Sequence, residues 1–234
     1  MRLKGKSALV TGSSSGIGRA IATRFARAGA SVVINGRSPE KIAAVVKEIE
    51  ALGARAIGVR ANVGSFAESQ AMVERAEREF GRLDILVCNA GVFHHTPFLE
   101  LSEAEWDEVL TVDLKGIFNC ARAAIGPMAR RGWGRVICVT AISGLTGYPE
   151  MAHIAAPTTG STRCSSFAAI RKATASPKPT FGADSPALAP FVRIVRVPPR
   201  YGRSLRFIEI ATSLRRLCRS SCQSNSTPGA STIR

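Results

Sequence analysis

Five short apolar runs alternate with amphipathic segments of helical length between residues 1 and 153, and this alternation limits the fold more than any other feature. The runs are rich in Val, Ile and Leu, as strands buried on both faces are. Strands alternating with helices build βαβ units around a parallel sheet. The predicted fold class is therefore α/β, a doubly wound parallel sheet. The predicted strands are 7–12, 31–36, 54–63, 83–91 and 134–144, and the predicted helices are 17–30, 38–53, 65–81 and two segments between Ser102 and Arg131.

The first turn between a predicted strand and a predicted helix is the glycine-rich stretch TGSSSGIGRA, residues 11–20. Glycine permits a tight turn and a close approach of the backbone to a pyrophosphate, and the following helix presents N–H groups to that phosphate. The motif follows a strand and opens a helix, and this context favours a Rossmann-type dinucleotide site over a turn used only for packing. The residues predicted to bind the cofactor here are Gly12, Ser14, Ser15, Gly16, Ile17 and Gly18.

The end of the second predicted strand, INGRS at 34–38, indicates which cofactor is bound. An acidic residue there would hydrogen-bond the adenosine ribose and repel a 2′-phosphate. Here Gly36 takes that place, and Arg37 and Ser38 follow. A guanidinium can hold a phosphate in a fork of hydrogen bonds. The sequence therefore favours NADP(H) over NAD(H), with Arg37 and Ser38 in the site; a solvated surface arginine is the alternative for Arg37.

Three motifs, in this order, resemble the short-chain dehydrogenase/reductase family over about residues 3–153. They are Thr11-Gly12-x-x-x-Gly16-Ile17-Gly18, Asn89-Ala90-Gly91, and WDEVLTVDLKGIF at 106–118. The resemblance implies an oxidoreductase that transfers hydride between NADP(H) and a carbonyl or secondary alcohol of a small molecule. It also implies a homo-oligomer formed through the two helices beside the active site. The further cofactor contacts that it implies are Asn62 and Val63 at the adenine, Asn89, Ala90 and Gly91 at the nucleoside, and Val112 near the adenosine ribose and the nicotinamide.

The same resemblance implies a catalytic asparagine, serine, tyrosine and lysine, and all four places differ in this chain. They hold Asp113, Ala141, Ile154 and Thr158. Asp113 can still hold a water, and Ser143 could replace the missing serine hydroxyl, so these two are the catalytic candidates. Ile154 carries no ionisable proton, although proton transfer by the tyrosine is central to the family's chemistry. The chain is therefore expected to be an impaired oxidoreductase; the alternative is a catalytically silent NADP-binding protein.

The composition changes at about residue 154. Residues 1–153 hold 19 Lys/Arg against 15 Asp/Glu, whereas residues 154–234 hold 13 against 2 and eight of the twelve prolines. We predict a dinucleotide-binding Rossmann domain at 1–153 and an atypical basic tail, rich in Pro, Ser and Arg, at 154–234. The tail contains one plausible strand at 190–202 and a plausible basic helix at 205–218.

We expect this tail to leave the fold incomplete or irregular, with the fifth strand as an open edge, because its composition offers little apolar surface to cover that edge. A shift of reading frame just before Pro157 and a divergent C-terminal half both explain the change of composition.

The remaining composition separates several function classes. The net charge of +15 would suit nucleic acid, but the excess lies in a tail without a recognisable binding module, so nucleic-acid binding is not favoured. No apolar run approaches the roughly 20 residues of a membrane span, and no secretory apolar segment precedes Thr11. The six cysteines form no C-x-x-C pair, which favours buried thiols, a cytoplasmic location and no metal site. His94 and His95, in the loop that follows the Asn-Ala-Gly motif, are predicted to be pocket wall, and His153 is predicted to be exposed or packed rather than catalytic.

Overall fold

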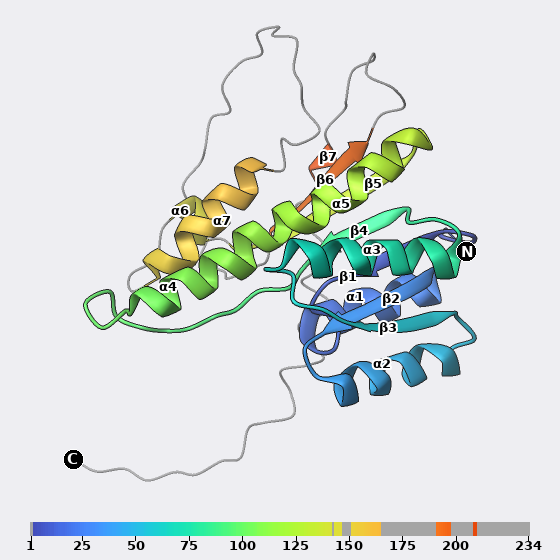
Figure 1. Cartoon of the computed structure of the whole chain (residues 1–234), viewed down its shortest axis with the longest axis horizontal. Coiled ribbons are helices and arrows are strands. Elements are labelled where there is room, and N and C mark those ends of the chain that lie inside the picture. Colours follow the sequence, from blue (N-terminus) through green and yellow to red (C-terminus); the bar gives the residue numbers. More distant parts are fainter. Residues whose placement is uncertain (1, 142, 147–150, 165–190, 198–207, 210–234) are drawn as a thin grey trace, which may run out of the picture.

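The computed structural model describes residues 2–141, 143–146, 151–164, 191–197 and 208–209 (Figure 1). Within them, the strands form one sheet in the order β3-β2-β1-β4-β5-β6-β7. The first five strands are mutually parallel, which confirms the predicted doubly wound sheet. Their bounds are β1 Ser7–Val10, β2 Ser31–Gly36, β3 Ala56–Arg60, β4 Ile85–Cys88 and β5 Gly134–Thr140.

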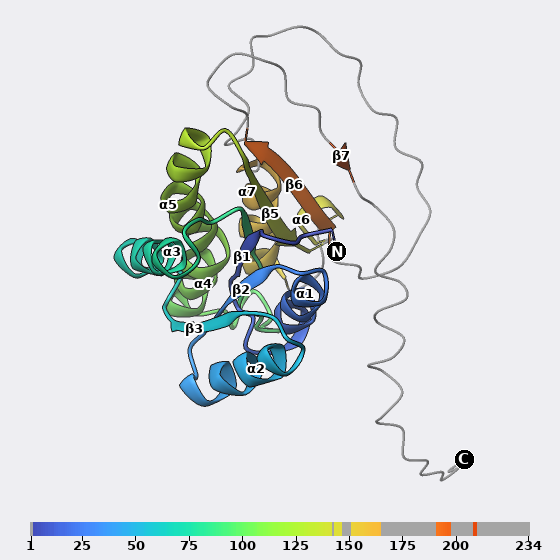
Figure 2. The ribbon, with the colours of Figure 1, turned by 90° about the vertical axis from the view of Figure 1, so that its right-hand side faces the viewer.

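Helices cover both faces of this sheet: α1 and α2 lie on one face, and α3 and α5 on the other (Figure 2). The helices α2, α3 and α4 each begin after a serine, and the serine hydroxyl accepts a hydrogen bond from a first-turn N–H. A π-helix, η1 Leu110–Lys115, joins α4 to α5, so the two segments predicted between Ser102 and Arg131 form one continuous helical run. The other bounds are α1 Gly16–Arg27, α2 Pro39–Ala51, α3 Phe66–Phe80, α4 Glu103–Val109 and α5 Gly116–Arg130.

The core lies in two layers, one on each side of the sheet. Along β1, Leu9 packs into the layer under α3 and α5, whereas Ala8 and Val10 pack into the layer under α1 and α2. Successive strand residues point to opposite faces, so burial on both sides requires the continuous apolar runs seen in the sequence.

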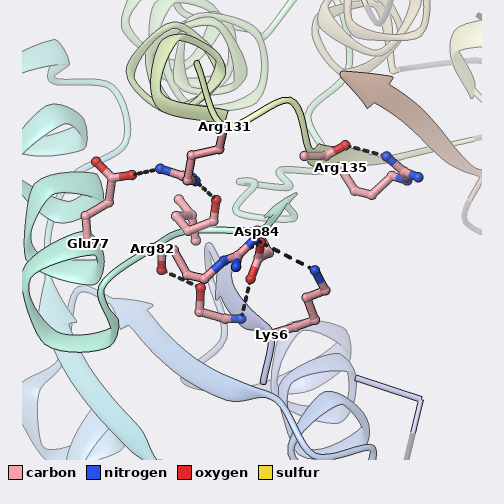
Figure 3. A network of polar contacts seen from close by, with 9 residues as sticks. Lys6, Glu77, Arg82, Asp84, Arg131 and Arg135 are labelled. Atoms are coloured by element: carbon pink, nitrogen blue, oxygen red, sulfur yellow. Dashed lines mark hydrogen bonds and ion pairs between the residues drawn. The ribbon is translucent and has the colours of Figure 1, made fainter. Parts of the chain in front are cut away.

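A polar network ties together the starts of β1, β4 and β5, at the opposite end of the strands from the glycine-rich turn (Figure 3). The fully buried Asp84 carboxylate accepts the Ser7 N–H at 3.1 Å and forms ion pairs with Lys6 at 3.8 Å and Arg82 at 2.6 Å. The Lys6 ammonium also lies 3.8 Å from the centre of the Trp133 ring. Burial of Asp84 is thus compensated by one N–H donor and two cations.

The sheet continues beyond β5, and our expectation that the tail would leave β5 as an open edge is wrong. Strand β6, Phe191–Val197, pairs antiparallel with the whole of β5, and β7, Ile208–Glu209, pairs with β6. The prediction relied on the average composition of the tail and gave too little weight to the local run FVRIVRV, whose Val, Ile and Phe favour a strand. The backbone of this run hydrogen-bonds the edge of β5. The strand predicted within 190–202 therefore exists, but it joins the sheet.

Outside β6, the described residues of the C-terminal half form the short strand β7 and two helices. The helix predicted at 205–218 is wrong at Ile208–Glu209, which form β7, and the remainder of that segment lies outside the described residues. Helices α6, Ser143–Thr146, and α7, Ala152–Cys164, follow β5, and α7 runs across the predicted domain boundary at 153/154. Among the described residues, no helix combines the length and the apolar character needed to cross a membrane.

Candidate functional site

The glycine-rich turn after β1 is held against the loop after β4 by a reciprocal set of hydrogen bonds. The Thr11 hydroxyl oxygen accepts the N–H groups of Asn89 and Ala90, at 2.9 and 3.0 Å. The Asn89 side-chain amide donates back to the carbonyl groups of Thr11 and Gly12, at 3.0 and 3.3 Å. A Cβ on Gly12 would lie 2.8 Å from the Ala90 Cα. Asn89, predicted to line the nucleoside, therefore fixes the shape of the turn.

The start of α1 has the features of a phosphate-binding helix end. Gly12 and Gly16 have positive φ angles of 63° and 54°, and a Cβ on Gly18 would collide with the Gly12 carbonyl oxygen. Ser15 precedes the helix without a side-chain capping bond, and the first turn has no acidic residue, in contrast to the serine-capped α2, α3 and α4. Ser15, Gly16 and Ile17 are exposed. The uncapped N–H groups fit a diphosphate.

Asn35, which the sequence analysis missed, joins the carboxyl ends of three strands. Its Oδ1 accepts the Gly12 N–H at 3.2 Å, and its Nδ2 donates to the carbonyl groups of Val59 and Ala61, at 3.2 and 3.1 Å. The side chain is buried. A polar residue at the end of an otherwise apolar strand, one position before Gly36, was the available signal.

The end of β2 presents the residue predicted to select the cofactor. Gly36 lies under Ser14: a Cβ at this position would be 2.5 Å from the Ser14 hydroxyl oxygen. The Arg37 side chain is 79% exposed, and its Nη1 lies 3.9 Å from Glu108 Oε1. The Ser38 hydroxyl accepts the Lys41 N–H and thereby caps α2. Arg37 can therefore reach a ligand, whereas the Ser38 hydroxyl already has a structural role.

The residues after β3 also have structural roles. Asn62 Oδ1 accepts the Gly64 N–H at 3.0 Å. The Val63 side chain is buried in the core under α3 and α5, and its carbonyl oxygen accepts the Asn119 amide at 2.9 Å. A Cβ on Gly64 would be 2.7 Å from Thr111 Cγ2, which places η1 beside the end of β3.

Asp113 lies in η1 and contacts the loop after β4. Its Oδ1 accepts the Val92 N–H at 2.9 Å, and Gly91 lies alongside, since a Cβ there would be 3.4 Å from the same oxygen. Burial raises the pKa of the Asp113 carboxyl to about 6; the Glu108 charge adds to this effect, whereas the Val92 N–H and His94 oppose it. π-Helical turns are frequent at functional sites. The neighbouring Val112 is half-buried against the core layer under α3 and α5.

Helix α7 brings the predicted tyrosine and lysine places to the same region. It packs against η1, α6 and β5. Ile154 is buried with Val109, Met151 and Val92, so it lies at the loop that Asp113 also contacts. The Thr158 hydroxyl donates to the Ile154 carbonyl at 2.7 Å, one helical turn back. Both side chains are therefore packed into the fold.

The region predicted to replace the catalytic serine lies beside Thr158. Ala141 is half-buried just after β5. Ser143 is buried, and within the part of the chain that the structure describes its hydroxyl oxygen has no hydrogen-bond partner. A Cβ on Gly144 would be 2.5 Å from Thr158 Cγ2. Ser143 therefore has an unused buried hydroxyl near α7.

The histidines hold the loop after β4. His153 is fully buried, and its Nε2 lies 3.0 Å from the His94 carbonyl oxygen; a carbonyl only accepts, so this nitrogen carries the proton. The His153 Nδ1 has no partner among the described side chains and backbone groups. His94 Nε2 lies 3.2 Å from Glu108 Oε2. Over the described ranges, no cluster of three or more His, Cys, Asp or Glu residues could hold a metal ion.

Three of the cysteines form a buried group between β4, β5 and α5. Cys88 and Cys138 are neighbours in register on adjacent strands, and the Cys120 thiol lies 3.7 Å from the Ser69 hydroxyl. Hydrogen bonding to Cys138 and burial raise the pKa of the Cys88 thiol, and burial raises that of Cys120 to about 11. The raised pKa values of Cys88 and Cys120 disfavour the thiolate, which is the reactive form, as burial in apolar surroundings does.

Comparison with known proteins agrees with this geometry. Residues 6–162 match the short chain dehydrogenase family. The 3-oxoacyl-[acyl-carrier-protein] reductase FabG of Staphylococcus aureus strain Mu50 is 42% identical over 156 residues, which are 66% of this chain and 63% of that protein. The (2S)-[(R)-hydroxy(phenyl)methyl]succinyl-CoA dehydrogenase subunit BbsD of Thauera aromatica is 42% identical over 147 residues, covering 63% and 59% of the two chains.

A solved structure extends the comparison to three dimensions. It is that of a Sinorhizobium meliloti 1021 protein assigned as a short-chain alcohol dehydrogenase, with a TM-score of 0.68 and 35% identity over 70% of this chain and 65% of the other. The matched segment spans less than two-thirds of the length of each of these three proteins. From the family match and the parallel Rossmann-type sheet, the chain belongs to the short-chain dehydrogenase family.

Proposed function

We propose that this chain binds NADP(H) at the turn Gly12–Gly18 and that its hydride-transfer activity is severely impaired. One observation carries the proposal: the glycine-rich turn and α7 both contact the loop after β4, and α7 carries Ile154 and Thr158 where the family resemblance implies tyrosine and lysine. The lineage is then an oxidoreductase acting on a carbonyl or a secondary alcohol. The alternative, a catalytically silent NADP-binding protein, is the limit in which the activity is zero.

Three features of the chain support the cofactor half. The uncapped N–H groups at the start of α1 would bind the diphosphate, and the glycines that shape the turn leave room for it. The exposed Arg37 guanidinium would bind the 2′-phosphate, and it directly follows Gly36, which takes the place of the acid found in NAD-binding folds. When bound, the nicotinamide supplies or accepts the hydride. The Asn89 and Asn35 side chains hydrogen-bond the turn to the ends of β4 and β2.

The impairment follows from proton transfer. A positioned acid or base contributes about 10²–10⁴-fold to such reactions. Ile154 cannot hold a proton, and Thr158 brings no positive charge to lower the pKa of a neighbouring acid. Ser143 keeps a buried hydroxyl that could orient a substrate oxygen, and the partly buried Asp113 carboxyl could hold a water. Neither group replaces the missing acid/base at residue 154.

The substrate class is proposed from the names of the relatives. One is named for a 3-oxoacyl group on an acyl carrier protein and another for a succinyl-CoA derivative, so small 3-oxoacyl thioesters are the first substrates to test. We further propose a cytoplasmic protein that forms a homo-oligomer through the helices beside the site. The sequence change after residue 153 is proposed to come from a shifted reading frame, which agrees with family matching that ends at residue 162.

Cofactor titration tests the proposed function. Binding of NADPH and NADH would be measured for the native chain, for Arg37→Ala, and for Arg27→Ala as the matched control. Arg27 is an exposed arginine at the far end of α1. We expect NADPH to bind more tightly than NADH, and Arg37→Ala to weaken NADPH binding at least tenfold, since a charge-assisted hydrogen bond contributes about 1.5–3 kcal/mol. Tighter NADH binding, or equal effects of the two substitutions, would contradict the proposal.

A further inference from the structure

Glu108 lies between the side chains of Arg37 and His94, where the strands of the sheet end. Its Oε1 lies 3.9 Å from Arg37 Nη1, and its Oε2 lies 3.2 Å from His94 Nε2. Arg37 follows β2, Glu108 belongs to α4, and His94 lies in the loop after β4. One carboxylate therefore links the arginine proposed to read the adenosine half of the cofactor with a loop that α7 also contacts.

The ion pair between Arg37 and Glu108 lies near the carboxyl ends of the strands. Thr111, three residues after Glu108, lies against Gly64 just beyond β3. Thr111 and Asp113 both belong to η1, and Asp113 accepts a hydrogen bond from the Val92 N–H beyond β4. In open α/β sheets the dinucleotide binds across these strand ends. The pair is therefore near the position at which the adenosine half is proposed to bind.

We propose that Glu108 is a cofactor-specificity residue. Its carboxylate pairs with the Arg37 guanidinium, and the 2′-phosphate of NADP(H) must displace it to bind Arg37. This inference rests on the proposed NADP(H) site. Carboxylate and phosphate oxygens are both acceptors for a guanidinium fork, so the two groups compete for one side chain. NAD(H) has a hydroxyl at the same place and does not require Arg37 to leave Glu108. Glu108 therefore lowers the preference for NADP(H) without weakening NAD(H) binding.

The size of the effect follows from the exposure of the pair. The side chains of Arg37 and Glu108 are 79% and 43% exposed, and water screens an ion pair at this depth. The affinity lost to such competition is therefore about two- to fivefold. A general change of surface charge would produce a similar number, so the experiment needs a control that changes the charge without the contact.

Asp107 is that control, because it is an exposed acid on the same helix, next to Glu108, and among the described residues it forms no ion pair with Arg37. Dissociation constants for NADPH and NADH would be measured for the native chain, Glu108→Gln, Asp107→Asn, Arg37→Ala and the double variant Arg37→Ala/Glu108→Gln. Glutamine keeps the size of the side chain and removes its charge. We expect Glu108→Gln to tighten NADPH binding two- to fivefold and to leave NADH binding unchanged. The same substitution should have no effect once Arg37 is alanine.

Each other outcome has a definite meaning. An equal gain from Asp107→Asn, an equal gain for NADH, or a gain that persists without Arg37 would show a general charge effect and overturn the role of Glu108. Unchanged NADPH binding in Glu108→Gln, alongside weaker binding in Arg37→Ala, would overturn that role while leaving the proposed function standing. Failure of NADPH to bind the native chain and all the variants would overturn both proposals.

Discussion

Replacing Asp113 by asparagine should stabilise the protein at neutral and alkaline pH. Asp113 is partly buried, and its carboxyl pKa rises from the ordinary 3.8 to about 6 in the folded chain, chiefly because of burial. Between these two values the folded chain binds more protons than the unfolded chain, so wild-type stability falls as the pH rises through this window. At about 1.4 kcal/mol per pKa unit, ionisation of Asp113 costs the fold up to about 3 kcal/mol above pH 7.

Asparagine removes this cost and keeps the hydrogen bond from Val92, because its Oδ1 can accept that N–H as Asp113 does. It is also the residue that the family resemblance implies at this place. Urea unfolding at pH 8 should give a free energy of unfolding up to about 3 kcal/mol higher for Asp113→Asn than for the native chain. The gain should shrink as the pH falls through 6 and disappear below about 4.

Asp107→Asn provides the control for this measurement, since Asp107 is exposed and undergoes the same chemical change. It should change the free energy of unfolding by less than about 0.5 kcal/mol at pH 8 and at pH 4. A loss of stability in Asp113→Asn at pH 8 would refute the reasoning. An equal gain at pH 8 and pH 4 would also refute it, because the benefit would then not come from removing an ionised carboxylate.

Three further predictions concern the fold. Gly18→Ala should lower the free energy of unfolding by about 1–3 kcal/mol in urea titrations, because the new Cβ would collide with the Gly12 carbonyl oxygen. Gly16→Ala is the comparison: its Cβ would point into open space, so only the positive φ should lower the free energy of unfolding, by about 1 kcal/mol. Asp84→Ala should cost about 1–3 kcal/mol in the same assay, because it leaves the buried Ser7 N–H without its acceptor; no loss would contradict the role given to that carboxylate. A chain ending at Cys164 loses β6, so light scattering should detect aggregation through the exposed edge of β5; a soluble monomer of unchanged stability would show that β6 does not protect this edge.

The sequence predicted the parallel half of the fold because strands buried on both faces must be continuously apolar. The predicted strand ends were less accurate. The predicted strands 54–63 and 83–91 are longer than β3 and β4, because their last residues bend away to build the site. Asn62 turns back to bond Gly64, and Asn89 gives its amide to the glycine-rich turn. Periodicity cannot show such departures, because the partners of these two amide side chains lie in turns that the apolar pattern does not describe.

Contacts between distant segments were the other part that the sequence could not show. The short run FVRIVRV at β6 was outweighed by the prolines and arginines around it, although strand pairing depends on the local run and on an available edge. Asn35 and Glu108 are single polar residues whose partners lie elsewhere in the chain, at Val59 and Ala61 and at Arg37 and His94. Their roles follow only from the three-dimensional arrangement.

The central claim is that the chain binds NADP(H) at the turn Gly12–Gly18 but lacks the acid/base that the family resemblance implies at residue 154. The most direct test is the rate of NADPH oxidation with a panel of small 3-oxoacyl thioesters, measured for the native chain and for the variant Ala141→Ser/Ile154→Tyr/Thr158→Lys. NADPH binding to both proteins would be measured in parallel. The account predicts that both bind NADPH, that the native chain turns over at or near background, and that the variant is faster by about 10²-fold or more. Turnover by the native chain at ordinary enzyme rates would contradict it, as would a variant that binds NADPH and stays at background.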